Sequence, residues 1–213
     1  MKKAKLTAFW QANKQFILFV VLLFCFRSSF ADWYDVPTGS MKPTIVEGDR
    51  VFVNKMAFRL DLPFTDIAVF KTGSPMAGDV IVFQSEAADT RLIKRVVGVP
   101  GDVVSMLNNQ LTVNGKQVAY SHADDTLEEH LTGYGHRIQL TPPLSPRHSF
   151  APVTVPQGHY LVLGDNRNHS ADSRYYGFVP ERELLGKATR VVFSLDPENY
   201  YLPRTERTLI SMR

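Results

Sequence analysis

Ser40 lies in a short segment whose composition gives the chain a sharp and rigid path. The segment reads Pro37-Thr38-Gly39-Ser40-Met41-Lys42-Pro43-Thr44, with a glycine and two prolines around the serine. A serine hydroxyl held in this way becomes a nucleophile when a neighbouring base takes its proton. An isolated Gly-Ser pair is more often a linker turn. The segment is not the Gly-x-Ser-x-Gly elbow of the α/β-hydrolases, because Lys42 occupies the last position.

Lys94 is the candidate base for such a serine. If residues 92–97 form a strand, Lys94 and Arg95 point to opposite faces, each between apolar neighbours. Burial lowers the pKa of a lysine from about 10.4, and a fall of roughly 3 leaves about half of it neutral near pH 7. A neutral amine can accept the serine proton, whereas an arginine stays protonated. The alternative is an edge strand whose charges prevent aggregation.

A third polar cluster follows the apolar run 160–163. It reads Gly164-Asp165-Asn166-Arg167-Asn168-His169-Ser170-Ala171-Asp172-Ser173-Arg174. One interpretation is a polar turn in which Asp172 pairs with Arg174. A Ser-His-Asp triad through His169 is a second one, although a single loop histidine is more often a solvated surface residue. Metal binding is disfavoured, because the histidines are scattered without ligand spacing.

The distribution of charge argues against a nucleic-acid-binding body. The 213 residues include 24 Lys or Arg and 21 Asp or Glu. Residues 1–31 contain five basic residues and no acidic one, so residues 32–213 contain 19 basic and 21 acidic residues. The basic excess is therefore confined to the N-terminal flank rather than spread over a folded surface. Cys25 is the single cysteine, which excludes an internal disulfide and a multi-cysteine zinc site.

The N-terminal flank contains an unbroken apolar run of 11 residues, Phe16 to Phe26, after four lysines. A cleavable signal peptide would end at Ser29-Phe30-Ala31. A lipoprotein signal would need a small residue before Cys25, but Phe24 stands there. A membrane anchor from Leu6 to Ala31 would have 26 residues, roughly 39 Å as a helix. The residues alone leave anchor and cleaved signal open, and in both cases the lysines stay inside and the body is exported.

The rest of the chain is predicted to be mainly β. Short apolar runs are bounded by Gly, Pro, Asp or Asn, which is typical of strands; they span residues 80–83, 96–97, 160–163 and 191–193. Asn114-Gly115 predicts a hairpin, because this pair suits the two positive φ angles of a type I′ turn. Residues after 32 show no long stretch of helical periodicity. Residues 121–158 hold four of the six histidines and five prolines, and we expect a loop-rich insertion there.

Taken together, these clusters resemble bacterial type I signal peptidase (leader peptidase), a membrane-anchored family of serine endopeptidases with a Ser/Lys dyad. The resemblance covers about residues 16–102 and 159–195. Each motif alone is weak, but four of them in the family's order behind an apolar segment form a strong signal. The four motifs are PTGSMKPT (37–44), GDVIVF (78–83), IKRVVGVPGD (93–102) and GDNRNHSADSRYYGFVP (164–180).

The resemblance implies a role for each residue that matches a family motif. Ser40 matches the nucleophile and Lys94 the general base. The Ser40 backbone N–H and the Thr38 hydroxyl match the two donors to the oxyanion. Ser170 matches the serine that hydrogen-bonds and orients the lysine amine. Asp172 and Arg174 match a supporting ion pair, and no metal or other cofactor is implied.

The resemblance also implies the substrate, an exported preprotein with small residues at positions −1 and −3 of its cleavage site. Shallow apolar pockets would select these residues. The positions of the motifs suggest five lining residues, for each of which ordinary core packing is the alternative; they are Val36, Met41, Ile45, Leu92 and Ile93.

The implied architecture is a single N-terminal transmembrane helix followed by an antiparallel β-sheet catalytic core. Residues 1–31 would form the cytoplasmic tail and anchor, residues 32–102 and 159–213 the core, and residues 103–158 an inserted, smaller β and loop region. The chain would cross the bacterial cytoplasmic membrane once, with its N-terminus inside and its catalytic part outside. Membrane lipid and preproteins would be its partners. A non-catalytic exported β-domain that binds signal peptides or another partner is the alternative.

Overall fold

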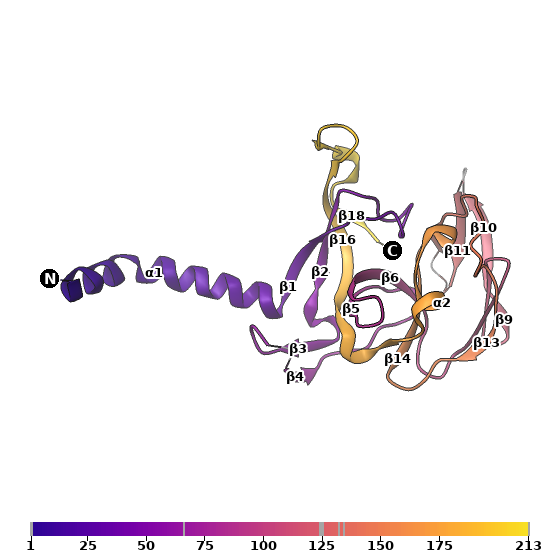
Figure 1. Ribbon diagram of the computed structural model, residues 1–213, viewed down its shortest axis with the longest axis horizontal. Helices are drawn as coiled ribbons and strands as arrows, with labels where there is room; N and C mark the ends of the chain where they lie inside the picture. Colours follow the sequence, from indigo (N-terminus) through magenta and orange to yellow (C-terminus); the bar gives the residue numbers. More distant parts are fainter. Residues whose placement is uncertain (1, 66, 124–125, 132, 134, 213) are drawn as a thin grey trace.

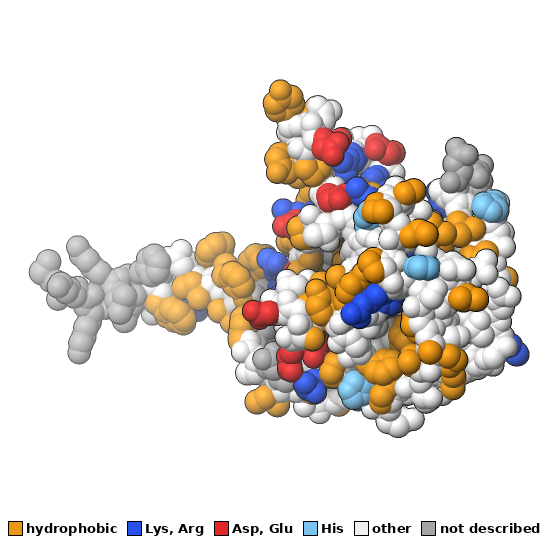
Figure 2. Space-filling view, turned by 45° about the vertical axis from the view of Figure 1, so that its right-hand side comes forward, with side chains coloured by type: hydrophobic (Ala, Val, Ile, Leu, Met, Phe, Trp, Pro, Cys, Tyr) orange, Lys and Arg blue, Asp and Glu red, His pale blue; other side chains and the backbone are white. Residues whose placement is uncertain are grey.

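Helix α1 (Lys2–Ser29) projects from the β-rich body (Figure 1). The computed structural model describes residues 2–65, 67–123, 126–131, 133 and 135–212. Trp10–Ser29 is long and apolar enough to cross a membrane. Hydrophobic side chains cover this part of the helix without a protein partner (Figure 2). A helix that is apolar on all sides and unpacked suits a lipid surrounding better than water.

The C-terminal end of α1 is tied to the body by hydrogen bonds. The Lys55 Nζ donates to the Ser28 carbonyl oxygen at 2.5 Å, and the Lys55 backbone N–H donates to the Phe30 carbonyl oxygen at 3.0 Å. The Phe64 backbone N–H donates to the Ser28 Oγ at 2.7 Å. The bond to the Ser28 carbonyl oxygen satisfies one of the groups that a helix end leaves without an internal partner. The helix therefore joins the body at a fixed joint.

The body is built around one antiparallel sheet of nine strands, as the mainly β prediction requires. Seven strands lie in the order β1-β2-β16-β5-β6-β14-β15, and β17 and β18 also pair with β16. The bounds are β1 (Ala31–Asp35), β2 (Asp49–Asn54), β16 (Leu184–Asp196), β5 (Val80–Ser85), β6 (Thr90–Gly98), β14 (His159–Leu163), β15 (Val179–Pro180), β17 (Leu202–Pro203) and β18 (Ile210–Ser211).

Seven further strands lie between residues 103 and 154, in two smaller sheets. The first sheet has the order β13-β7-β8-β9, and the second has the order β10-β11-β12. Their bounds are β7 (Val103–Leu107), β8 (Gln110–Val113), β9 (Lys116–Gln117), β10 (Ala119–Ala123), β11 (Thr126–His130), β12 (Gly135–Ile138) and β13 (Phe150–Thr154). A separate hairpin pairs β3 (Arg59–Asp61) with β4 (Ala68–Lys71). The division of the chain into a core and an inserted region stays a prediction.

The sequence signals for strands and turns are confirmed. The four apolar runs lie in β5, β6, β14 and β16. Asn114 and Gly115 have φ angles of 52° and 74° and connect β8 to β9. Residues 121–158 contain more strand than the loop-rich prediction allowed. Pro152 is accommodated in β13 because the pairing with β7 shifts register between Phe150 and Val153.

Strand β6 lies where three hydrophobic clusters meet. Ile93 packs against the cluster of β2 and β16, Val96 belongs to the cluster of β5 and β14, and Val97 belongs to the cluster of β7 and β8. Full burial of each such side chain contributes about 1.5–3 kcal/mol to stability. The only α-helix beyond α1 in the described residues is the single turn α2 (Ser173–Tyr176). The 3-10 turns are η1 (Lys55–Ala57), η2 (Arg167–His169), η3 (Glu181–Glu183) and η4 (Thr205–Arg207).

Candidate active site

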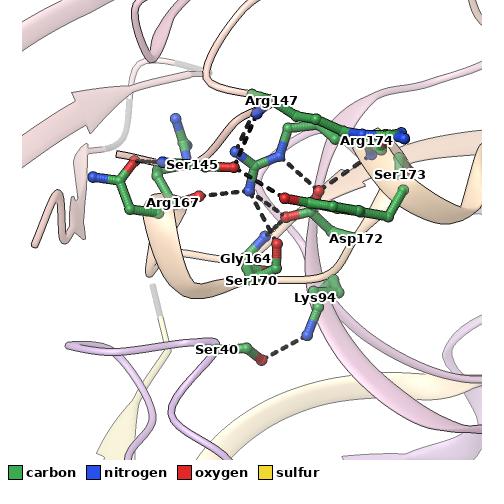
Figure 3. A network of polar contacts seen from close by, with 12 residues as sticks. Ser40, Lys94, Ser145, Arg147, Gly164, Arg167, Ser170, Asp172, Ser173 and Arg174 are labelled. Atoms are coloured by element: carbon green, nitrogen blue, oxygen red, sulfur yellow. Dashed lines mark hydrogen bonds and ion pairs between the residues drawn. The ribbon is translucent and has the colours of Figure 1, made fainter. Parts of the chain in front are cut away.

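Ser40 and Lys94 meet directly, although 54 positions separate them in the chain. Ser40 lies in the turn that follows β1, and Lys94 lies in the middle of β6 (Figure 3). The Lys94 Nζ is 2.6 Å from the Ser40 Oγ. This distance is short enough for a proton to pass between the two atoms.

Burial lowers the pKa of Lys94 to about 8, because the charged amine loses its hydration. The side chain is buried, with 2% of the residue exposed. The nearby charges of Asp172 and Asp165 act in the opposite direction but do not outweigh burial. Besides the serine hydroxyl, the Nζ contacts the Ile93 carbonyl oxygen at 2.9 Å. Within the described part of the chain, no carboxylate hydrogen-bonds to the amine.

The alternative in which Lys94 and Arg95 are exposed charges that protect a strand edge is wrong, because both side chains are buried. Strand β6 pairs with β5 from Thr90 to Arg95, and with β14 on its other side from Arg95 onward. Arg95 is as buried as Lys94, with 2% exposed, and its guanidinium donates two hydrogen bonds to Asp165, at 2.9 and 2.7 Å. A bidentate pair of this kind stabilises a buried arginine charge. One strand thus buries two cations, of which only Arg95 has a carboxylate partner.

The turn that carries Ser40 is held by the loop after β14. The Asn166 backbone N–H donates to the Ser40 carbonyl oxygen at 3.1 Å, and the Asn166 side-chain amide donates to the Gly39 carbonyl oxygen at 3.1 Å. The Thr44 hydroxyl donates to Asp165 at 2.5 Å. Arg95 holds the other oxygen of the same carboxylate. Asp165 therefore connects the strand of the lysine to the turn of the serine.

Ser170 lies beside the two reactive groups (Figure 3). Its Oγ is buried and has no hydrogen-bond partner among the described residues. Gly164 leaves the space between Ser170 and Ser40: a Cβ at this position would lie 2.2 Å from the Ser170 Oγ and 2.4 Å from the Ser40 carbonyl oxygen. A glycine is therefore required for this close approach.

Asp172 and Arg174 form a buried bidentate ion pair. The Arg174 Nε and Nη2 each donate to one carboxylate oxygen of Asp172 at 2.8 Å. Asp172 also accepts the Gly164 backbone N–H at 3.0 Å, and Arg174 donates to the Arg167 carbonyl oxygen at 2.7 Å. The pair thus holds the backbone on both sides of Ser170 (Figure 3).

The chain matches known proteins over most of its length. A family model described as signal peptidase, peptidase S26, matches residues 9–193. Signal peptidase I of Pseudomonas aeruginosa is 37% identical over an alignment that covers 90% of this chain and 74% of the relative. The chain belongs to the signal peptidase family. Signal peptidase I of Bacillus amyloliquefaciens is 33% identical over 90% of this chain and 89% of the relative. This family member is a serine endopeptidase.

A solved structure of a signal peptidase I from Enterococcus faecalis shares 31% sequence identity with this family member. The match covers 54% of this chain and 96% of the other, with a TM-score of 0.36.

Among the described residues, no three His, Cys, Asp or Glu side chains group as metal ligands.

Thr38 and His169 are two further residues for which the sequence analysis considered a catalytic role. Thr38 is exposed in the nucleophile turn, two residues before Ser40. The His169 Nε2 lies 3.3 Å from the Pro142 carbonyl oxygen at the surface, and no hydrogen bond joins the His169 ring to Ser40. The geometry therefore favours the lysine over the histidine as the base for Ser40.

The five predicted pocket residues differ in burial. Met41 and Ile45 have 0% exposure and belong to the cluster of β2 and β16, as does the buried Val36. Leu92 and Ile93 are partly buried on the first half of β6. Their role in selecting substrate stays a prediction.

Sequence reasoning missed a second buried polar network near Ser40 and Lys94. Arg167 donates two hydrogen bonds to Glu129 of β11, at 2.8 and 2.5 Å, and Glu129 also accepts the Tyr120 hydroxyl at 2.6 Å. Burial alone would raise the pKa of Glu129, but the Arg167 charge and its hydrogen bonds hold the pKa well below its usual range. The only sequence signal was the density of charged residues in 164–174; the partner Glu129 is distant in the chain.

Proposed function

We propose that this chain is a membrane-anchored signal peptidase that uses Ser40 and Lys94 to cut signal peptides from exported preproteins after small residues. The observation that carries this proposal is the 2.6 Å contact between the serine hydroxyl and a buried lysine amine that lacks a carboxylate partner among the described residues. A base of this kind is neutral in a useful fraction of molecules near neutral pH, as general-base catalysis requires.

The chemistry follows from these two groups. The neutral Lys94 Nζ accepts the proton of the Ser40 hydroxyl, and the Oγ attacks the carbonyl carbon of the scissile bond. The Ser40 backbone N–H and the Thr38 hydroxyl donate to the oxyanion. The Lys94 ammonium then gives its proton to the leaving amine, which leaves an ester on Ser40. Water, deprotonated by the same amine, hydrolyses this ester and releases the signal peptide.

Ser170 would orient the amine between these steps. Its buried hydroxyl has no partner within the described part of the chain, and a hydroxyl rotates freely to accept from or donate to a neighbour. Ser170 lies in the same polar site as Lys94, which makes the amine a suitable partner for its hydroxyl (Figure 3).

An unpaired strand edge beside the dyad supports a peptide substrate. Strand β14 pairs with β6 only along Arg95–Gly98, so Thr90–Ile93 has β5 on one side and no described strand on the other. An extended peptide can add to such an edge through main-chain hydrogen bonds, with pockets for alternate side chains giving specificity. Leu92 and Ile93 lie on this edge directly before the base.

Helix α1 supports the membrane location. Its apolar length suffices to span a bilayer, and four lysines precede its apolar run, which favours a cytoplasmic N-terminus. Trp33 on β1 is 47% exposed just beyond the helix end, at the level where tryptophan is enriched in membrane interfaces. The body would then lie on the outer surface.

The test is cleavage of a preprotein with Ala at −1 and −3 by the full chain in detergent. We expect wild type to cut after the −1 residue, and Ser40→Ala and Lys94→Ala to be inactive, while His169→Ala keeps activity. Product masses identify the bond. An inactive wild type on several preproteins with lipid present would favour the binding alternative, and an active Lys94→Ala would exclude the dyad.

The pH profile provides an independent test of the base. Because the pKa of Lys94 is lowered to about 8, the rate should rise as pH increases through this value and fall about tenfold per pH unit below it. The measurement is kcat/KM between pH 5 and 9.5. A rate that stays flat over this range contradicts a titrating lysine.

A further inference from the structure

A cavity of about 550 Å³ lies on the side of the nucleophile turn that faces the smaller sheets. Pro43, three residues after Ser40, forms one wall, and Leu127, Ile138 and Leu140 are part of the other. Its lining contains no Asp, Glu, Lys or Arg among the described residues. This size is within the range of sites that bind small ligands or a few side chains.

Main-chain hydrogen bonds fix this cavity relative to Ser40. The Gln139 backbone N–H donates to the Asp165 carbonyl oxygen at 2.8 Å, and the Arg167 N–H donates to the Gln139 carbonyl oxygen at 3.0 Å. Asn166, between them in the chain, donates to the Ser40 carbonyl oxygen. These bonds fix the position of residues 138–141 relative to Ser40.

The path of the chain from α1 indicates which part of a substrate reaches this cavity. A signal peptide lies N-terminal to the scissile bond and, under the proposed function, comes from the membrane in which α1 lies. Strand β1 starts at the end of α1, at Ala31, and the chain leads to Ser40 and then to Pro43. A substrate that enters at the same surface and follows this direction passes Ser40 before Pro43, so that its mature residues reach the cavity. Strands β10 and β11 lie on the side of the body away from α1 (Figure 1).

We propose that the cavity between Pro43 and residues 138–141 binds the first residues of the mature chain, and that it selects uncharged, preferably apolar side chains there. The proposal rests on the proposed function, because it assigns the other half of the same substrate. Its lining supplies the chemistry: the side chains of Leu127, Ile138 and Leu140 are aliphatic, and the polar lining residues are Thr126, Gln139, Thr141 and His122, with no carboxylate, lysine or arginine among the described residues.

The decisive variant is Leu140→Glu, with Leu144→Glu as its matched control. Both leucines are exposed, at 37% and 65%, and lie in the same connection after β12, but only Leu140 lines the cavity. The substrates are peptides with one signal-peptide end, Ala at −1 and −3, and Leu, Asp or Lys at the second to fourth mature positions. A fourth peptide is amidated after the first mature residue.

We expect Leu140→Glu to raise KM about 10-fold for the Leu peptide and to lower it for the Lys peptide. The truncated peptide should be cut at the wild-type rate by all three proteins, and Leu144→Glu should match wild type on every peptide. Equal behaviour of the two variants, or an equal loss on the truncated peptide, overturns this assignment. A wild type that cuts no peptide refutes the proposed function itself, whereas dyad-dependent cleavage that is indifferent to the mature residues refutes only the cavity assignment.

Discussion

Lys94 and Arg95 are neighbours on β6, are equally buried, and meet opposite surroundings. The Lys94 amine contacts a serine hydroxyl and a backbone carbonyl oxygen. The Arg95 guanidinium donates hydrogen bonds to both oxygens of the Asp165 carboxylate. A buried cation without a carboxylate partner gives up its proton easily, whereas a paired one keeps its charge and serves as a structural link. Burial lowers the pKa of Lys94, and no carboxylate among the described residues hydrogen-bonds to its amine to reverse this shift.

Asp172 lies close enough to Lys94 to affect its pKa, but it does not cancel the lowering of this pKa by burial. The charges of Asp172 and Asp165 raise the pKa of Lys94, and the charge of Arg174 lowers it. The Arg174 guanidinium donates to both carboxylate oxygens of Asp172 and thereby compensates its negative charge. The buried ion pairs thus hold the geometry of the site while they leave the amine uncompensated.

The largest expected effect is the loss of activity in Lys94→Arg. Arginine keeps the charge but cannot lose its proton, so the rate of cleavage should fall about 10³-fold or more. The measurement is single-turnover cleavage of a preprotein, with circular dichroism as the check on folding. A residual rate within tenfold of wild type would show that position 94 does not act as a base.

The second-largest effect is a loss of stability in Arg95→Met. The change leaves the Asp165 carboxylate buried without its arginine partner, and should lower the free energy of unfolding by about 3–5 kcal/mol. Denaturant unfolding in detergent measures it. The double variant with Asp165→Asn should recover most of the loss, because no buried charge remains. If Arg95→Met is as stable as Lys94→Arg, the two cations do not differ as described.

The smallest effect is expected for Ser170→Ala. Removal of the hydroxyl should lower kcat about 10- to 100-fold with little change in KM, because the amine loses its orienting group. Stability should not fall, since the Oγ has no hydrogen-bond partner among the described residues. Ser173→Ala is the control: its hydroxyl accepts the Val162 N–H at 2.9 Å, so stability should fall while kcat is retained. Full activity of Ser170→Ala would remove Ser170 from the mechanism.

The local parts of this structure could be predicted from the sequence, because short-range signals determine them. Apolar runs became strands, and Asn114-Gly115 adopted the positive φ angles of its turn. The burial of a lysine in β6 followed from its apolar neighbours. That Arg95 would be buried beside it did not follow, because its partner Asp165 is 70 positions away.

The same limit applies to Glu129. Nothing near it in the sequence indicates that Arg167, 38 positions later, holds it in the protein interior. An acidic residue in a strand with other polar residues is normally solvated, and only the assembled sheets show the exception. The motif after β14 contains Asp165 and Arg167, and only the tertiary structure shows that their partners are Arg95 and Glu129.

The fixed joint at the end of α1 has a mechanical consequence. Because Lys55 and Phe64 clamp Ser28, the helix and the body turn together as one lever about this point. If α1 spans a bilayer, as we propose, a tilt of the helix changes the height of Ser40 relative to the lipid headgroups. Bilayer thickness, which sets the tilt of a helix of given length, would then determine how far Ser40 lies from the membrane surface.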